Sequence, residues 1–351
     1  MNFEEVIKES ILSSSIIDED NFGKIKQNKK RGQSYTFTIF DLEGNPLYMA
    51  KFFDYLVDLK KEVEVSNLDQ FSDLYDLIQN IESLPGMAYV PYDIGEMIDK
   101  IQFQQRCFKR YINVCQREEI DCFPDILFSI EELKVNNSFY GLLIENYIDG
   151  VTLEQLLPIP SELRVQLSFD FLRQMSNVLT QLEVEGIVHR DLSPDNIMYK
   201  SGTFVVIDPG MVKISDDNPA TQSSMILGKF QYASPEQFVG NAKLSTFKSD
   251  LYSLGIVALE ILIGYNPLGE IVNEMKTGAM IQNHIPHVEL LKRFEREIED
   301  DYYETVGENE FTSRLLLIIK KMIQVQEELR FGSVEAFNTL MQGLKERELY
   351  D

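Results

Sequence analysis

The chain has 351 residues, 44% of them hydrophobic, and carries 33 Lys and Arg against 57 Asp and Glu. This length favours two lobes or domains, and this hydrophobic content excludes a chain that is disordered throughout. The net charge of −24 would repel nucleic acid and anionic lipid, so we expect neither nucleic acid nor membrane as a partner. It would suit basic protein partners, although an acidic surface is more often only a well-solvated one.

The cysteines and the N-terminus favour a reduced, cytoplasmic protein. No two of the three cysteines have the CxxC spacing of a metal site, and three histidines add little to a zinc site. The N-terminal sequence MNFEEVIKES has neither a basic start nor a long apolar stretch, so no signal peptide is expected. The longest apolar run, residues 251–264, is too short to span a bilayer and contains Glu260, which predicts a buried helix.

The N-terminal part alternates between helical and β patterns. Tyr35, Phe37 and Ile39 at every second position predict a strand, and the turn that follows predicts a hairpin. Apolar residues at helical spacing from Ile94 to Cys115 predict one long helix. The segments expected here are a lead-in helix, a hairpin, an acidic helical segment and two further strands, at 1–20, 21–53, 54–122, 126–130 and 139–145.

Beyond residue 150 the pattern becomes largely helical. Helices are expected at 152–157, 161–185, 248–263 and 311–347, with short strands near 187–188, 196–199 and 203–207. The plan is therefore an α+β fold with a small β-rich part, a linker at 146–150 and a larger α-rich part.

The strongest chemical signal is the run His189-Arg190-Asp191-Leu192-Ser193-Pro194-Asp195-Asn196. It matches the H-R-D-L-x-x-x-N loop, in which a carboxylate takes the proton of an attacking hydroxyl and an amide oxygen reaches a magnesium ion held by phosphates. Asp191 and Asn196 occupy those two positions. Twelve residues later, Asp208-Pro209-Gly210 follows a short strand, where a second metal-binding aspartate belongs. Alone, that triplet would more often be only a turn.

Together these motifs resemble the eukaryotic-type (Hanks-type) Ser/Thr protein kinase family, as a divergent member of bacterial type, over residues 20–345. The resemblance implies a bilobal fold, with an N-lobe at 21–145, a hinge at 146–150 and a C-lobe at 151–351. It also implies ATP and Mg²⁺ as cofactors, with both Asn196 and Asp208 as metal ligands. The implied reaction is phosphoryl transfer to serine or threonine hydroxyls of proteins, the chain itself included.

Other positions extend the resemblance. Met49-Ala50-Lys51 resembles V-A-I-K, which implies that Lys51 holds the α- and β-phosphates and that Ala50 packs on adenine. Ser234-Pro235-Glu236 resembles A-P-E, which implies an ion pair with Arg330. Asp250, in a segment that resembles S-D-x-W-S-x-G, would hold the backbone of the catalytic loop.

The adenine site is implied by the same resemblance. The backbone of Asn146 and Ile148 in the hinge would bind the adenine edge, and Met198 would form the floor beneath the ring. The usually apolar gatekeeper position falls on Glu145, or on Ile144 after a shift of one residue.

The glycine-rich loop is the weakest match to the family. In the aligned run Gln27-Asn28-Lys29-Lys30-Arg31-Gly32, only Gly32 remains of the G-x-G-x-x-G pattern. The three basic residues are either phosphate clamps that act by charge or a solvated basic tip.

A second departure is an exchange of two positions. Ser193 stands where the resembled enzymes carry a lysine near the γ-phosphate, and Lys229 stands where they carry a threonine. We therefore expect Lys229 to supply the missing ammonium as a catalytic residue.

The carboxylate partner of Lys51 remains open between Glu64, Glu96, Glu118 or none. The helical segment that contains these residues is either a docking surface or an insertion that buries its own small core. For regulation, Arg190 could pair with a phosphorylated residue of segment 211–227, or Asp216-Asp217 could imitate the phosphate; the candidate phosphosites are Ser215, Thr221, Ser223 and Ser224.

Two other functions compete with the kinase. A pseudokinase that acts as a binding or scaffold module would explain the poor glycine-rich loop. A small-molecule phosphotransferase of related fold would share the Asp191, Asn196 and Asp208 pattern but would generally lack the pairing of Glu236 with Arg330.

Overall fold

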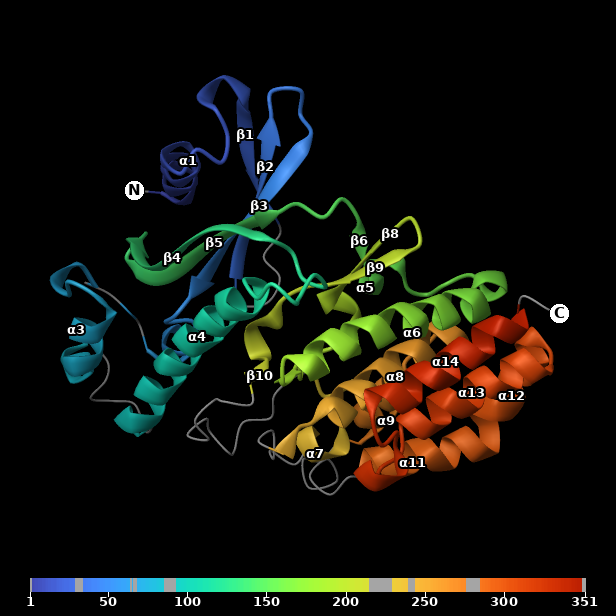
Figure 1. Cartoon of the computed structure of the whole chain (residues 1–351). Coiled ribbons are helices and arrows are strands. Elements are labelled where there is room, and N and C mark those ends of the chain that lie inside the picture. Colours follow the sequence, from blue (N-terminus) through green and yellow to red (C-terminus); the bar gives the residue numbers. More distant parts are fainter. Residues whose placement is uncertain are drawn as a thin grey trace. The chain divides into compact units, whose positions relative to one another are not determined.

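The computed structural model of the chain describes residues 2–28, 34–63, 65, 68–84, 93–214, 229–238, 244–275 and 285–348. The chain divides into two compact units, Met1–Asp149 and Gly150–Asp351, which are described separately below. Figure 1 gives the labels of the elements.

The first unit contains a five-stranded antiparallel sheet with the strand order β1-β2-β3-β5-β4. The expected hairpin is β2 and β3, and a further strand, β1, extends it. The strands are β1 (Phe22–Gln27), β2 (Ser34–Asp41), β3 (Pro46–Asp54), β4 (Ile126–Val135) and β5 (Ser138–Asn146). The sheet pairs two hairpins that are far apart in the sequence, because β3 lies beside β5.

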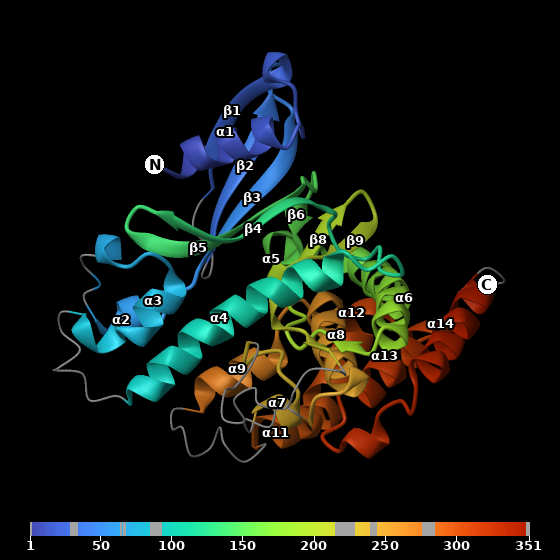
Figure 2. The same ribbon diagram turned by 60° about the vertical axis from the view of Figure 1, so that its left-hand side comes forward.

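Each face of this sheet contributes side chains to a buried cluster, and alternation along β5 assigns its residues to the faces. Leu142 and Ile144 pack in one cluster with the N-terminal helix α1 (Phe3–Ser13), whereas Leu143 packs in a second cluster with the long helix α4 (Ile94–Cys115). Phe3 of α1 packs against aromatic rings of the sheet, including Phe52 at 4.6 Å between centroids and an interplanar angle of 55°. Figure 2 shows α1 and α4 with the strands.

The helical segment between β3 and β4 shares its core with the sheet. Leu68, Leu74 and Leu77 belong to the same cluster as Phe139 and Leu143 of β5. Most buried members of this cluster lie in the segment itself, between Tyr55 and Tyr111. The segment therefore buries a core of its own, in line with the second of the two expectations, and this core also covers part of one face of the sheet. Besides α4 it contains α2 (Leu59–Glu62), α3 (Leu74–Gln79) and the 3-10 turns Leu68–Gln70 and Ile81–Ser83.

The second unit is mainly helical. Its helices are α5 (Leu153–Leu156), α6 (Ser161–Val184), α7 (Pro235–Phe238), α8 (Phe247–Ile263), α9 (Pro267–Glu274), α11 (Ile285–Arg293), α12 (Glu299–Val306), α13 (Glu310–Met322) and α14 (Val334–Glu348). A π-helical turn, Phe294–Ile298, joins α11 to α12. The short strands are β6 (Val151–Thr152), β7 (Ile187–Val188), β8 (Ile197–Lys200), β9 (Thr203–Val206) and β10 (Lys213–Ile214).

The apolar run at 251–264 forms the central helix α8, as expected, and most of its side chains are buried. Gly255 allows α13 to approach closely, since a Cβ there would lie 2.8 Å from Ile323 and 2.9 Å from Met322. No single helix among the described residues combines the length and apolarity that a membrane span requires; only α8 and α9 do so jointly, and they are bent by 101° at their break.

The prediction of a single helix at 311–347 is wrong. Helix α13 ends at Met322 and α14 begins at Val334. Ser333 accepts a hydrogen bond from the Ala336 N–H and so caps the new helix, while Arg330 has an extended backbone between the two. The sequence pattern also missed the helices between 267 and 306.

Candidate active site

The backbone of the catalytic loop is held by a buried aspartate from helix α8. The two oxygens of Asp250 accept hydrogen bonds from the backbone N–H groups of His189, at 2.7 Å, and Arg190, at 2.8 Å. Arg190 has a positive φ of 68°, which bends the chain just before Asp191. Gln237 of α7 donates to the Arg190 carbonyl at 2.8 Å. The expected role of Asp250 is therefore present in the structure, and it fixes the loop from a distant element.

Asp191 and Asn196 are joined directly across the loop. The Asn196 Nδ2 donates to Asp191 Oδ2 at 2.8 Å and to the Asp191 carbonyl at 2.9 Å. Burial raises the pKa of Asp191 to about 7, and the negative charges of Asp208 and Asp195 act in the same direction. The positive charge of Lys229 and the hydrogen bond from Asn196 oppose this rise.

Asp208 stands at a bend that is tied to the same loop. Its φ of 60° and ψ of 66° are left-handed, and its carboxylate accepts a long hydrogen bond of 3.4 Å from the Gly210 N–H. The Ile207 N–H donates to the Asn196 carbonyl at 2.8 Å, so the residue before Asp208 is fixed against the catalytic loop. The structure therefore brings Asp191, Asn196 and Asp208 together within the second unit.

These residues fit a magnesium ion. The Asn196 nitrogen is committed to Asp191, so its amide oxygen is the end of the side chain that can face a cation. The negative charges of Asp191 and Asp208 act on each other, which a divalent cation would relieve. In the described part of the chain, no three His, Cys, Asp or Glu side chains enclose a metal, so an ion here would take its other ligands from phosphate or water.

The exchanged pair, Ser193 and Lys229, meets on one carboxylate oxygen. The Ser193 hydroxyl donates to Asp195 Oδ1 at 2.8 Å, and the Lys229 ammonium forms an ion pair with the same atom. Lys229 remains 44% exposed. The structure thus places Lys229 beside the catalytic loop, bound to Asp195.

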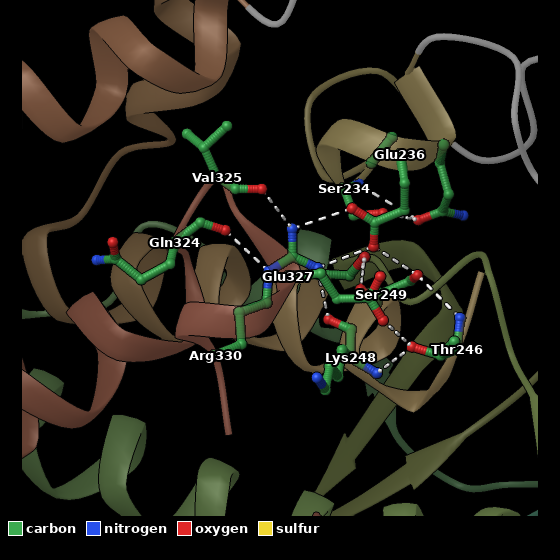
Figure 3. A network of polar contacts seen from close by, with 12 residues as sticks. Ser234, Glu236, Thr246, Lys248, Ser249, Gln324, Val325, Glu327 and Arg330 are labelled. Carbon is green, nitrogen blue, oxygen red and sulfur yellow. Dashed lines mark hydrogen bonds and ion pairs between the residues drawn. The ribbon is translucent and has the colours of Figure 1, made fainter. Parts of the chain in front are cut away.

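The ion pair expected between Glu236 and Arg330 is present and forms the centre of the network in Figure 3. Arg330 is 2% exposed and binds both Glu236 oxygens, at 2.8 and 3.0 Å. Its remaining N–H groups donate to three backbone carbonyls, those of Gln324, Val325 and Lys248. Ser249 of α8 donates to Glu236 at 2.6 Å. This network ties α7 to α8 and to the segment before α14.

Arg190 is occupied by backbone groups in this structure. It is 5% exposed, and its guanidinium donates to the carbonyls of Met211, at 2.8 Å, and Val212, at 3.0 Å. Arg190 was expected to pair with a phosphorylated residue of segment 211–227. From residue 215 onward this segment lies outside the described residues, and so do all four candidate phosphosites and Asp216-Asp217.

In the first unit, Lys51 has partners that the sequence reasoning did not select. Its Nζ lies 2.6 Å from Glu145 Oε1 and donates to the Tyr111 hydroxyl at 2.8 Å. Of the expected partners, Glu96 binds Lys100 at 3.0 Å, Glu118 is exposed and Glu64 lies outside the described residues. The sequence offered one signal for this pairing, because Glu145 is the single acidic residue in the otherwise apolar end of strand β5.

The assignment of Ala50 to the adenine site is wrong. Successive residues of a strand face opposite sides of the sheet, so Ala50 points away from Lys51. It is fully buried in the cluster with α1. Met49, two residues before Lys51, shares the face of Lys51 and is the register partner of Glu145.

The backbone of the expected hinge is partly engaged in hydrogen bonds within the first unit. The Asn146 N–H donates to the Asp125 carbonyl at 3.1 Å, so only the Asn146 carbonyl could bind adenine. Ile148 is half-buried in the first unit, and Met198 is half-buried on β8 of the second. Gly32 and the basic residues Lys29, Lys30 and Arg31 lie outside the described residues.

Comparisons with known proteins agree with this geometry. A family model described as the protein kinase domain matches residues 110–341. The chain is 32% identical over 126 residues to the probable serine/threonine-protein kinase PknB of Lactococcus lactis, a match that covers 36% of this chain and 20% of that protein. It is 33% identical over 145 residues to the serine/threonine-protein kinase PrkC of Bacillus subtilis, covering 41% of this chain and 22% of that protein.

A longer match, 28% identical over 217 residues, is to the serine/threonine-protein kinase D of Synechocystis and covers 60% of this chain and 36% of that protein. The chain therefore spans between about a fifth and a third of the length of these relatives. The family model covers well over half of the chain and includes Asp191, Asn196 and Asp208. The expected α+β kinase fold is confirmed, and the chain belongs to the protein kinase domain family, with relatives among the bacterial eukaryotic-type Ser/Thr kinases.

Proposed function

We propose that the chain is a protein kinase that transfers the γ-phosphate of ATP, with magnesium, to serine or threonine hydroxyls of proteins. The observation that carries this proposal is the bond between Asn196 Nδ2 and Asp191 Oδ2, at 2.8 Å, beside Asp208. It orients a carboxylate toward an incoming hydroxyl and turns an amide oxygen toward a metal ion. The relatives are all named serine/threonine kinases, which supports the choice of hydroxyl.

The proposed roles follow the chemistry of each group. Asp191 accepts the proton of the attacking hydroxyl, and Asn196 and Asp208 hold magnesium, which neutralises charge on the β- and γ-phosphates when bound. Lys51 binds the α- and β-phosphates as a cation. Lys229 adds a positive charge beside the loop from which the family's lysine is missing.

The adenine contacts belong to the same proposal. The Asn146 carbonyl accepts from the adenine amino group, the Ile148 N–H donates to the ring, and Met198 packs under it. The net charge of −24 favours basic protein substrates over nucleic acid and membrane. The three cysteines, which lack metal-site spacing, support a reduced, cytoplasmic protein. Autophosphorylation would use the serines and threonines of the segment before Ser234.

Transfer of radiolabelled phosphate tests the proposal. The purified chain is incubated with γ-labelled ATP and magnesium, with itself or a generic basic protein as acceptor. Label on serine or threonine that disappears with Asp191→Ala or with EDTA is the expected result. If the folded wild-type chain transfers no label to either acceptor, the enzymatic proposal fails and the pseudokinase takes its place.

A further inference from the structure

A carboxylate partner of Lys51 comes from the sheet. Lys51 and Glu145 form a buried ion pair, with side chains 12% and 5% exposed. Tyr111 of α4 is fully buried and bridges the pair: its hydroxyl accepts from Lys51 and donates to Glu145 Oε2, each at 2.8 Å. All three residues belong to the first unit.

The strand register fixes this pair. Lys51 of β3 lies opposite Leu143 of β5, and Met49 lies opposite Glu145. Lys51 and Glu145 are therefore diagonal neighbours on one face of the sheet, a separation that long side chains readily cross. Because the strands are hydrogen-bonded neighbours, the backbone positions of both charges are set by the sheet itself.

Helix α4 supplies a neutral group at the point where a carboxylate is required. In protein kinases the phosphate-binding lysine is held by a glutamate of a helix, and movement of that helix makes or breaks the pair. Here Tyr111 of α4 reaches Lys51 with a phenol. A buried ammonium needs a counter-charge, because burial without one disfavours its charged form. Glu145 provides that charge.

We propose that Glu145 is the positioning residue that orients Lys51 toward the phosphates of ATP, in place of a helix glutamate. The inference rests on the proposed function and extends it to regulation. A shift of α4 relative to the sheet would break the hydrogen bonds of Tyr111 but leave the ion pair between β3 and β5 intact. Movement of this helix is therefore not the switch that assembles the lysine pair in this kinase.

Binding of a fluorescent ATP analogue tests the positioning role of Glu145 without requiring catalysis. Glu145→Gln keeps the shape of the side chain and removes its charge, and we expect it to raise the Kd about 10- to 100-fold. Glu145→Asp should recover part of this loss. Tyr111→Phe keeps the ring and should change the Kd less than about threefold. Glu131→Gln is the matched control, because Glu131 lies on β4 of the same sheet and pairs with Lys109 of α4 but is 67% exposed.

A double-mutant cycle separates positioning from general stability. If Glu145 acts through Lys51, then Glu145→Gln should have no further effect on the Kd in the background of Lys51→Met. An undiminished effect in that background would overturn the proposal, as would a Glu145→Gln variant that binds the analogue as tightly as the wild type or more tightly. Thermal melting of each variant confirms that the compared proteins are folded.

The outcomes also distinguish this inference from the proposed function. A wild-type chain that binds the analogue, responds to Glu145→Gln as expected and transfers no phosphate would sink the proposed function alone. A chain that transfers phosphate normally with Glu145→Gln in place would sink the inference alone. A folded wild-type chain that binds no nucleotide would sink both.

Discussion

The loop around Asp191 and the surroundings of Lys51 are built in different ways. The loop is held by residues from its own sequence motif and by Asp250, which accepts two backbone hydrogen bonds. Lys51 is held by Glu145 and Tyr111, which lie on a different strand and on a helix outside any motif. The residues proposed to handle the hydroxyl and the metal thus follow the family pattern, whereas we propose that the support of Lys51 departs from it.

The largest expected effect is at Asp191. Replacement by asparagine keeps the shape but removes the group that accepts the proton, so kcat should fall by about 10²- to 10⁴-fold. Steady-state kinetics measures this, with Asp170→Asn as the control, because Asp170 is a half-buried residue of α6 that pairs with Arg173. A near-normal kcat in Asp191→Asn would show that Asp191 does not accept the proton of the attacking hydroxyl.

The second prediction concerns the contribution of the Arg330 network to the stability of the second unit. Although burial raises the pKa of Glu236, its hydrogen bond to Arg330 and the positive charge there lower it more, so the pKa lies below 4.5. Glu236→Gln leaves a buried guanidinium without its counter-charge and should cost about 3–5 kcal/mol in the free energy of unfolding. Denaturant unfolding measures this, with the exposed Glu328→Gln as the control.

The same pair predicts a pH dependence of known sign. A carboxyl with a lowered pKa contributes stability above its unfolded pKa, and that contribution is lost as the pH falls through the folded value. The difference in melting temperature between wild type and Glu236→Gln should therefore be constant above pH 5.5, roughly one unit above the unfolded pKa, and shrink below pH 4.5. A difference that persists unchanged at pH 3, roughly 1.5 units below the reference value, would show that the charge does not matter.

The stability of the first unit can be tested in the same way, in the helical segment between β3 and β4. Leu77 is fully buried in the cluster that includes Leu143 of β5. Leu77→Ala should cost about 2–4 kcal/mol in the free energy of unfolding, because the cavity opens in a core shared with the sheet. Tyr75→Ser on the same helix, where the tyrosine is 72% exposed, should cost little. Equal effects of the two would mean that this segment is not part of the common core.

The smallest expected effect is at Lys229. Because this lysine is partly exposed and already paired with Asp195, Lys229→Ala should lower kcat only about tenfold with a smaller change in KM. The double variant Ser193→Lys with Lys229→Thr should restore most of the loss, since it returns the positive charge to the loop. An unchanged kcat in Lys229→Ala would show that Lys229 pairs with Asp195 but has no role in catalysis.

Local sequence alone determined the catalytic loop, the turn at Asp208 and most of the strands. These features depend on residues that are close in the chain or on an alternation of period two, and both can be read without knowing which elements meet. The pairing of Glu236 with Arg330 was also within reach, because two motif positions stood at their expected places.

Tertiary structure alone decided what holds Lys51, which face Ala50 occupies and where the helix after α13 begins. Glu145 became a partner of Lys51 only because β3 pairs with β5 in one register, although the two residues are 94 positions apart in the sequence. Arg330 interrupts the expected helix because its five N–H groups find acceptors on α7, on α8 and after α13. Such choices depend on distances between remote segments, and the pattern of a single segment carries no information about them.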